Sequence, residues 1–214
     1  MVTVPRSFIA GFSAARVMAI IRGSDAAASV ETARTLFAEG FRYVEVSLTT
    51  KDALHVIQVI RESAPAGCSI GAGTVLTARD AADVAAAGGQ FIVTPAVTPS
   101  IEAGVRQGLP VVAGALSPTE VWLAMQHGAS AVKLFPASVG GPGYLRSLRD
   151  PLPDIPFLAV GGVGLTDVVE YLRAGAVGVG VGGPLVGDAA AGGDLAALRE
   201  RARSYLAAAQ GFSA

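Results

Sequence analysis

A lysine within an apolar segment is the residue of this chain best suited to covalent chemistry. Lys133 lies in Ala131-Val132-Lys133-Leu134-Phe135-Pro136, which otherwise has the composition of a buried strand. Burying an unpaired ammonium group is costly, and loss of its proton removes that cost. A neutral amine can attack a ketone and form a Schiff base. The alternative is that only the aliphatic stem is buried and the ammonium group extends to solvent.

A carboxylate occupies a similar environment earlier in the chain. Glu45 stands between Val44 and Val46 in a second apolar segment. If its side chain and that of Lys133 face one cavity, Glu45 could serve as the general acid and base that moves protons around a carbinolamine. The alternative is a structural ion pair, for which Arg22 is a candidate partner.

Eight short hydrophobic segments alternate with segments of helical pattern. The runs are continuous rather than alternating, which indicates strands covered on both faces, and glycines end several of the helices. The predicted strands are 17–21, 43–46, 69–72, 91–94, 110–112, 131–134, 157–160 and 177–179. The predicted helices are 25–39, 51–63, 77–87, 98–107, 117–127, 142–149, 166–173 and 194–209.

This order predicts an α/β fold, a (β/α)8 TIM barrel in a single domain over residues 1–214. A short N-terminal helix, residues 1–11, would close the base of the barrel. A doubly wound open sheet is the alternative. Trp122 and Met125 lie at helical spacing with Val121, and we expect all three to pack between their helix and the barrel.

Polar residues and glycines collect after the predicted strands, where barrels place their active sites. Arg22 could hold a substrate carboxylate in a bidentate contact, or form a surface salt bridge. Gly73 and Thr74 offer backbone amides and a hydroxyl for a carboxylate, or form a plain turn. The pairs Gly161-Gly162 and Gly182-Gly183 are typical of the phosphate site that follows strands seven and eight, although tight turns also use glycine pairs.

Composition limits the classes of function. Of the 214 residues, 51% are hydrophobic and 15% charged, and the net charge is −1, which argues against nucleic acid or an anionic membrane as partner. No apolar run is long enough to suggest a membrane span. Cys68 is the single cysteine, which excludes an internal disulfide and fits a reducing cytoplasm. His55 and His127 do not belong to a cluster of Cys, Asp or Glu residues at ligand spacing, so we expect no metal site.

From Ala19 to Leu185 the chain resembles the family of 2-keto-3-deoxy-6-phosphogluconate aldolases, which includes 2-keto-3-deoxy-6-phosphogalactonate and 4-hydroxy-2-oxoglutarate aldolases. Several ordered motifs carry the resemblance, and together they are specific. They are Val44-Glu45-Val46, Gly71-Ala72-Gly73-Thr74-Val75-Leu76, Val93-Thr94-Pro95, Lys133-Leu134-Phe135-Pro136 and Val160-Gly161-Gly162-Val163.

The resemblance implies a cytoplasmic class I aldolase, without metal or cofactor, that assembles as a homotrimer. Its substrate would be a 2-keto-3-deoxy-6-phospho sugar acid, cleaved to pyruvate and glyceraldehyde 3-phosphate, and it could also cleave 4-hydroxy-2-oxoglutarate to pyruvate and glyoxylate. Lys133 would form the Schiff base, and Glu45 would transfer protons through a water. The resemblance assigns the remaining substrate contacts to Arg22, Thr49, Gly73, Thr74, Pro95, Phe135, Gly161, Gly162, Gly182 and Gly183.

Two positions depart from the phosphogluconate pattern. Thr49 stands where the phosphogluconate enzymes commonly carry arginine. The enzymes of the galactonate type also lack that arginine, and this favours a galactonate configuration. Pro184 stands where relatives often have serine or another polar residue, and proline has no backbone N–H to offer a phosphate. The substrate could therefore lack a phosphate. A phosphate-binding barrel isomerase or synthase and a non-catalytic sugar-acid sensor are the other functions that this scaffold allows.

Overall fold

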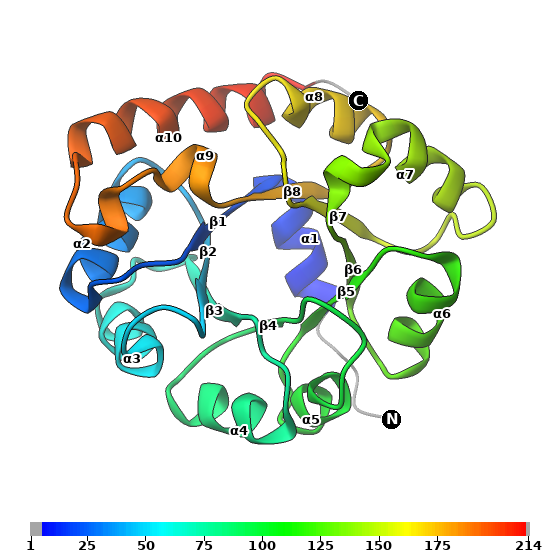
Figure 1. The fold of residues 1–214 in the computed structure, drawn as a ribbon, viewed down its shortest axis with the longest axis horizontal. Coiled ribbons are helices and arrows are strands. Elements are labelled where there is room, and N and C mark those ends of the chain that lie inside the picture. The colour runs from blue at the N-terminus through cyan, green and yellow to red at the C-terminus, as the bar shows by residue number, and fades with distance from the viewer. Residues whose placement is uncertain (1–5, 213–214) are drawn as a thin grey trace.

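The computed structural model describes residues 6–212, and its strands close into a parallel barrel with helices around the outside (Figure 1). The strands are β1 (Val17–Ile21), β2 (Tyr43–Ser47), β3 (Ser69–Gly73), β4 (Ile92–Val93), β5 (Val111–Ala115), β6 (Ala131–Leu134), β7 (Phe157–Val160) and β8 (Gly178–Val181). Each strand pairs with the next, and β8 pairs with β1. The predicted (β/α)8 barrel is therefore confirmed, and the open sheet is excluded.

The helices follow the predicted segments within a few residues. They are α1 (Arg6–Ala15), α2 (Ala26–Ala38), α3 (Ala53–Ser63), α4 (Ala78–Ala86), α5 (Ser100–Arg106), α6 (Pro118–Gln126), α7 (Gly141–Arg149), α8 (Asp167–Arg173), α9 (Gly183–Val186) and α10 (Leu195–Gln210). The N-terminal helix is present but extends further along the chain than predicted, and residues 1–5 of the prediction lie outside the described residues. The four-residue helix α9 was not predicted, because it is too short to show a periodic pattern.

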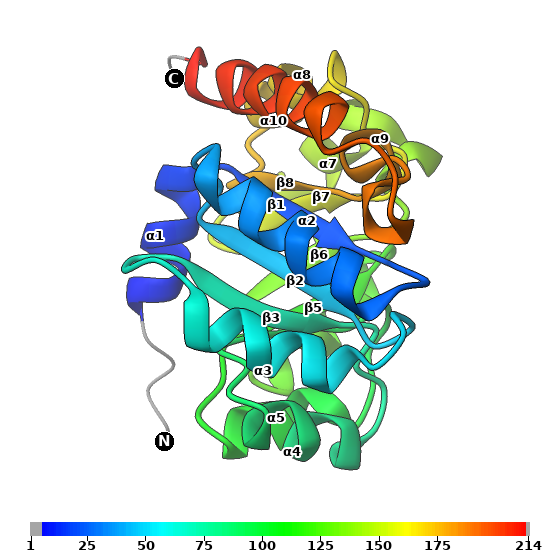
Figure 2. The ribbon, with the colours of Figure 1, turned by 90° about the vertical axis from the view of Figure 1, so that its left-hand side faces the viewer.

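The base of the barrel is closed by α1, at the end opposite to the carboxyl ends of the strands (Figure 2). Phe12 of α1 is fully buried, and its ring meets the ring of Tyr43 edge to face at 5.2 Å between centroids. Phe8 lies 5.3 Å from Phe91 in the same aromatic group. Because these rings fill the lower interior, the space for a ligand within the barrel remains at the opposite end.

Alternation along the strands decides which side chains enter the barrel. On β2, Val44 and Val46 pack outward against the helices, whereas Tyr43 belongs to the interior cluster. Side chains two residues apart on a strand share a face, so Glu45 also points inward. On β6, Val132 and Leu134 pack outward in the same way, which leaves Lys133 facing the interior.

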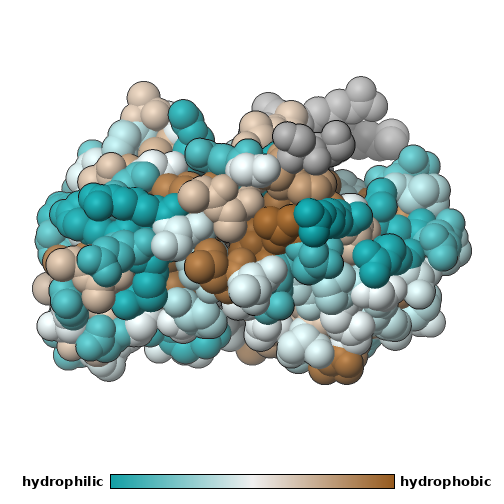
Figure 3. All heavy atoms as spheres, turned by 90° about the horizontal axis from the view of Figure 1, so that it is seen from above, coloured by the Kyte–Doolittle hydropathy of each residue, from teal (hydrophilic) through white to brown (hydrophobic). Residues whose placement is uncertain are grey.

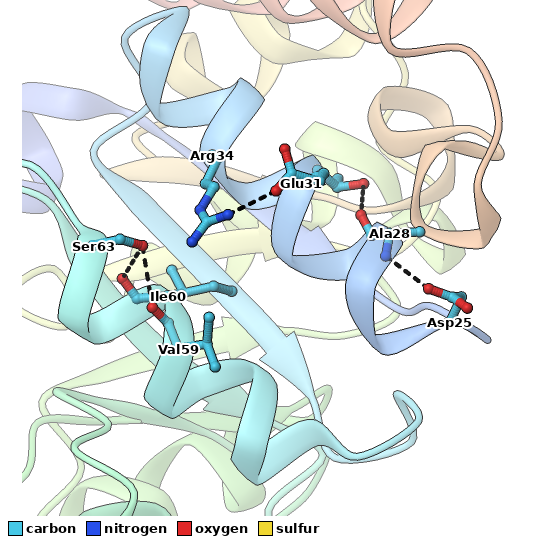
Figure 4. A network of polar contacts seen from close by, with 8 residues as sticks. Asp25, Ala28, Glu31, Arg34, Val59, Ile60 and Ser63 are labelled. Atoms are coloured by element: carbon cyan, nitrogen blue, oxygen red, sulfur yellow. Dashed lines mark hydrogen bonds and ion pairs between the residues drawn. The ribbon is translucent and has the colours of Figure 1, made fainter.

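Local polar contacts stabilise α2 and α3, two helices that pack against the strands. Asp25 caps α2, since its carboxylate accepts a hydrogen bond from the Ala28 N–H at 2.8 Å (Figure 4). Arg34 and Glu31 pair at 2.7 Å one turn further along the same helix. The Ser63 hydroxyl ends α3 by donating to the Val59 carbonyl at 3.1 Å. The Asp25 and Ser63 contacts reduce fraying at helix ends next to loops, whereas the exposed Glu31–Arg34 pair lies within α2.

The last helix, α10, lies across α2 and α8 on the outside of the barrel. Arg199 and Arg203 of α10 pair with Glu39, just after α2, at 2.9 and 2.7 Å. On this face, hydrophilic side chains lie on both sides of a narrow hydrophobic area (Figure 3). No described helix is both long and apolar enough to cross a membrane.

One packing prediction is wrong for a single residue. Val121 of α6 is fully buried and Met125 packs against the core, but the Trp122 side chain is 56% exposed. Adjacent helical positions differ by about 100° in direction, so the residue next to a buried valine points away from the barrel.

Candidate active site

A cavity of about 370 Å³ opens at the carboxyl ends of the strands. Every predicted site residue lines it except Glu45 and Gly73, which lie beside it. The lining residues are Ile20, Arg22, Thr49, Thr74, Pro95, Lys133, Phe135, Val160, Gly161, Gly162, Val163, Gly180, Val181, Gly182, Gly183 and Pro184. The barrel thus brings together residues from seven different strand ends that are far apart in the chain.

Lys133 lies in the wall of this cavity and is only 6% exposed. Its Nζ is 4.7 Å from the centroid of the Phe135 ring, a cation–π geometry when the amine is protonated. No carboxylate of the described residues forms an ion pair with it. The alternative in which the amine extends to bulk solvent does not match this burial. Lys133 is thus a cavity-facing amine without a direct ion pair to any described residue.

Glu45 is 1% exposed, and its Oε2 has no hydrogen-bond partner among the described residues. Burial raises the pKa of this carboxyl, and the positive charges of Lys133 and then Arg22 partly oppose the increase. The direct Glu45–Arg22 ion pair, considered as the structural alternative, is not formed. A carboxyl with a raised pKa and a free oxygen is suited to act as both proton acceptor and proton donor.

A glycine makes room for the Glu45 carboxyl. A Cβ atom added to Gly73 would lie 1.7 Å from Glu45 Oε1 and 2.4 Å from its Cδ. Gly73 is paired with Ser47 in the β2–β3 register, so the carboxyl packs directly over the end of β3. Gly73 therefore lies outside the cavity lining and acts on the site by leaving space for Glu45.

Three hydroxyl groups form a cluster between Glu45 and the cavity mouth. The Ser47 hydroxyl bonds to those of Thr49 at 2.8 Å and Thr74 at 2.9 Å. Thr74 has φ +60°, a left-handed conformation that is rare for a β-branched residue. Ser47 was not among the predicted site residues, although its spacing of two from Glu45 places it on the same face of β2. The two bonds within the cluster use two of its three hydroxyl protons, which leaves one to donate to a carboxylate.

The opposite wall of the cavity is formed by glycine loops. Gly161 and Gly162 have φ +91° and +75°, and added Cβ atoms would meet the Phe135 ring at 3.0 Å and Ser138 at 2.6 Å. Among the backbone bonds of the described residues, none uses the N–H of Gly162 or Gly183. These free donors can bind an anion, whereas Pro184 adds none.

Arg22 lies at the exposed rim of the cavity and forms no ion pair with another described residue. His55 and His127 lie on α3 and at the end of α6, away from the cavity. Within residues 6–212, no group of three or more His, Cys, Asp or Glu side chains is placed to hold a metal ion.

The fold and the cavity define a (β/α)8 barrel with a buried lysine, a buried carboxyl and free backbone N–H groups at its mouth. The chain belongs to the KDPG and KHG aldolase family, which it matches over residues 9–200. Its relatives are named aldolases, and aldolases are lyases; the protein is thus an enzyme of the lyase class.

Similar proteins include the probable 2-dehydro-3-deoxy-6-phosphogalactonate aldolase of Rhizobium meliloti (strain 1021), which is 37% identical over 194 residues covering 90% of each chain. A native KDPGal structure is 31% identical with a TM-score of 0.86, and the match covers 91% of this chain and 94% of that one. The KDPG aldolase of Legionella pneumophila, solved with pyruvate captured at low pH as a covalent carbinolamine intermediate, is 28% identical with a TM-score of 0.80. That match covers 96% of this chain and 98% of the other.

Proposed function

We propose that this protein is a class I aldolase that cleaves a 2-keto-3-deoxy-6-phospho sugar acid to pyruvate and glyceraldehyde 3-phosphate. The observation that carries the proposal is the buried, unpaired amine of Lys133 in the wall of the cavity, with the buried carboxyl of Glu45 beside that cavity. The pyruvate carbinolamine described for the Legionella pneumophila relative supports the same chemistry here.

The proposed reaction begins when Lys133 Nζ attacks the C2 ketone and forms a carbinolamine, which loses water to give a protonated imine. The C4 hydroxyl then gives up its proton, the C3–C4 bond breaks, and its electron pair moves into the imine to form an enamine. The aldehyde leaves. Protonation of the enamine carbon and hydrolysis of the imine release pyruvate and restore the amine.

Glu45 is the proposed proton carrier in these steps. It makes no direct contact with Lys133, so a water in the cavity would pass the proton between the carboxyl and the substrate. Its raised pKa supports this role, because a carboxyl must both accept and release a proton within one turnover.

The remaining residues would orient the substrate. Arg22, Thr74 and Thr49 would hold the pyruvyl carboxylate, and Phe135 and Pro95 would pack around the imine. The phosphate would lie against Gly161, Gly162, Gly182 and Gly183, where free backbone N–H groups support anion binding. The threonine at position 49 and the phosphogalactonate name of the Rhizobium meliloti relative favour the galactonate configuration.

Borohydride trapping with pyruvate tests the Schiff base. The chain contains two lysines, Lys133 and Lys51, and Lys51 is exposed outside the cavity, which makes Lys51→Ala a matched control. We expect a reduced pyruvyl adduct, located by peptide mapping, on Lys133 in wild-type protein and in Lys51→Ala. Lys133→Ala should show none. An adduct-free wild type that is folded by circular dichroism would contradict the mechanism.

Substrate screening then decides the remaining choices. Pyruvate release is measured with the phosphogluconate and phosphogalactonate acids, their unphosphorylated forms, and 4-hydroxy-2-oxoglutarate. We expect the phosphogalactonate acid to give the highest kcat/KM. A higher value for the unphosphorylated acid would show that the glycine loops do not bind a phosphate.

The proposal also includes a single-domain chain that works as a cytoplasmic homotrimer. A related chain, 31% identical, occurs in a cage designed by fusing symmetric oligomeric domains, which supports self-association. Light scattering after size-exclusion chromatography tests it, and a mass other than three copies would contradict the trimer.

A further inference from the structure

A second cavity of about 360 Å³ lies at the base of the barrel, at the opposite end from the lysine. It is enclosed by α1, by the C-terminal end of α10 and by the loops that precede β2 and β3, and Figure 2 shows α1 and that end of α10 on the same side of the barrel. We call it the base cavity. Its volume is within the range of small-molecule sites, about 300–1,000 Å³. Nothing in the proposed aldolase reaction uses it.

Small residues keep the base cavity open. Half of its lining residues are glycine or alanine, and these come from three separate segments of the chain. A Cβ atom on Gly11 would lie 2.5 Å from the Tyr43 hydroxyl, and one on Gly67 would lie 3.2 Å from the Arg42 guanidinium. Gly40 and Gly67 have φ +108° and +81°, where other residues are strained. Larger side chains at these places would fill the space in front of Arg42 and Tyr43.

Tyr43 presents an unpartnered hydroxyl to the base cavity. The residue is 7% exposed, its ring is held by Phe8, Phe12 and Phe91, and its hydroxyl bonds to no other described residue. Burial raises the pKa of this phenol, with Arg42 partly opposing the shift, so the hydroxyl keeps its proton at neutral pH and can donate it. The hydroxyl is accessible from the base cavity, so a ligand there could accept its hydrogen bond.

Arg42 supplies the charge of the base cavity. It lines the cavity and forms no ion pair with any carboxylate of the described residues. No aspartate or glutamate lines the cavity, and its third polar group is the Gln210 amide. Two donors, one of them cationic, beside apolar walls match a carboxylate attached to a compact apolar group.

We infer that the base cavity binds a small organic carboxylate, with the carboxylate on Arg42 and the Tyr43 hydroxyl and the apolar part against the small-residue walls. The site is separate from the mouth of the barrel, because the two cavities share no lining residue. The inference does not depend on the proposed aldolase activity.

Benzoate is the probe for this inference, with its affinity for the full chain measured by saturation-transfer NMR titration. Arg42→Gln removes the charge, and Tyr43→Phe removes only the hydroxyl. Arg79→Gln is the matched surface control, since Arg79 lines neither cavity, and Arg22→Gln reports binding at the mouth. We expect Arg42→Gln to weaken benzoate binding about tenfold or more and Tyr43→Phe about fivefold. The two other variants should bind like the wild type.

Three results would overturn the inference. The first is the absence of benzoate binding by the folded wild-type chain. The second is loss of binding in Arg22→Gln but not in Arg42→Gln, which would place benzoate at the mouth. The third is displacement of benzoate by inorganic phosphate at equal concentration, because an ion without an apolar part should compete poorly for a cavity with apolar walls. Thermal melts of every variant establish that a loss of binding is not a loss of fold.

Discussion

The substitution Gly73→Ala should displace the Glu45 carboxyl without touching the cavity itself. The added Cβ would lie 1.7 Å from Glu45 Oε1, whereas ordinary contact begins at 3.4 Å, so the carboxyl must move by about 1.7 Å. The three atoms nearest to the added Cβ all belong to the Glu45 side chain, so this side chain moves first. A misplacement of about 1 Å at a reacting group can cost about 100-fold in rate. We therefore expect kcat/KM to fall at least about 100-fold, or about 2.7 kcal/mol in the barrier.

The fold should survive this substitution. Overpacking lowers the free energy of unfolding by about 1–3 kcal/mol. A domain of this size loses about 2–4 °C in Tm for each kcal/mol of lost stability. Gly143→Ala is the matched control, because nothing lies within 4 Å of the added Cβ on α7, and it should keep wild-type activity. Pyruvate release measured by a coupled assay gives kcat/KM, and differential scanning calorimetry gives Tm.

A double-mutant cycle separates displacement of Glu45 from a general disturbance. In a Glu45→Ala background the side chain that Gly73→Ala would strike is absent. The second substitution should then lower the residual kcat/KM by no more than about twofold, far below its effect on the wild type. The reasoning is refuted if folded Gly73→Ala keeps wild-type kcat/KM, or if it costs as much in the Glu45→Ala background.

Three further expectations concern charge and hydrogen bonding. Because burial raises the folded-state pKa of Glu45, ionisation of this carboxyl destabilises the fold. Glu45→Gln should therefore be more stable than wild type above that pKa, and the gain should vanish below the ordinary value of 4.5. Urea unfolding across pH measures this difference. Thr94→Val removes a fully buried hydroxyl that donates to the Ala96 carbonyl at 2.6 Å and accepts from the Gly114 N–H at 3.1 Å, and it should cost about 1–3 kcal/mol in the free energy of unfolding; a loss within error would contradict this. Arg22→Gln should raise KM more than it lowers kcat if Arg22 binds the substrate carboxylate equally in ground and transition states, and steady-state kinetics showing the reverse would oppose that role.

The barrel was predictable because its evidence is local. Each strand is a short run of hydrophobic residues, and several of the helices before them end in a glycine with positive φ, as at Gly40, Gly88 and Gly128. Such features depend on neighbouring residues alone. The ends of the strands were predicted less accurately. The strand β4 is limited to Ile92–Val93 where 91–94 was predicted, and β5 extends to Ala115 where the prediction ended at residue 112.

The general position of the candidate site was also predictable, because the carboxyl ends of parallel strands meet at one end of a barrel. Lys133 and Glu45 stood out as ionisable groups in hydrophobic runs. Ser47 did not, because a serine at a strand end is common and its bonds to Thr49 and Thr74 depend on the neighbouring strand.

The sequence by itself determined the order of strands and helices and the chemical types available at the barrel mouth. Closure of the sheet decided the rest. It set the register that turns Glu45 and Lys133 inward, placed Gly73 against the Glu45 carboxyl and kept that carboxyl from pairing directly with Arg22. It also created the base cavity from segments that no local pattern connects. Contacts between distant segments depend on how the whole sheet twists and closes, which no short stretch of residues encodes.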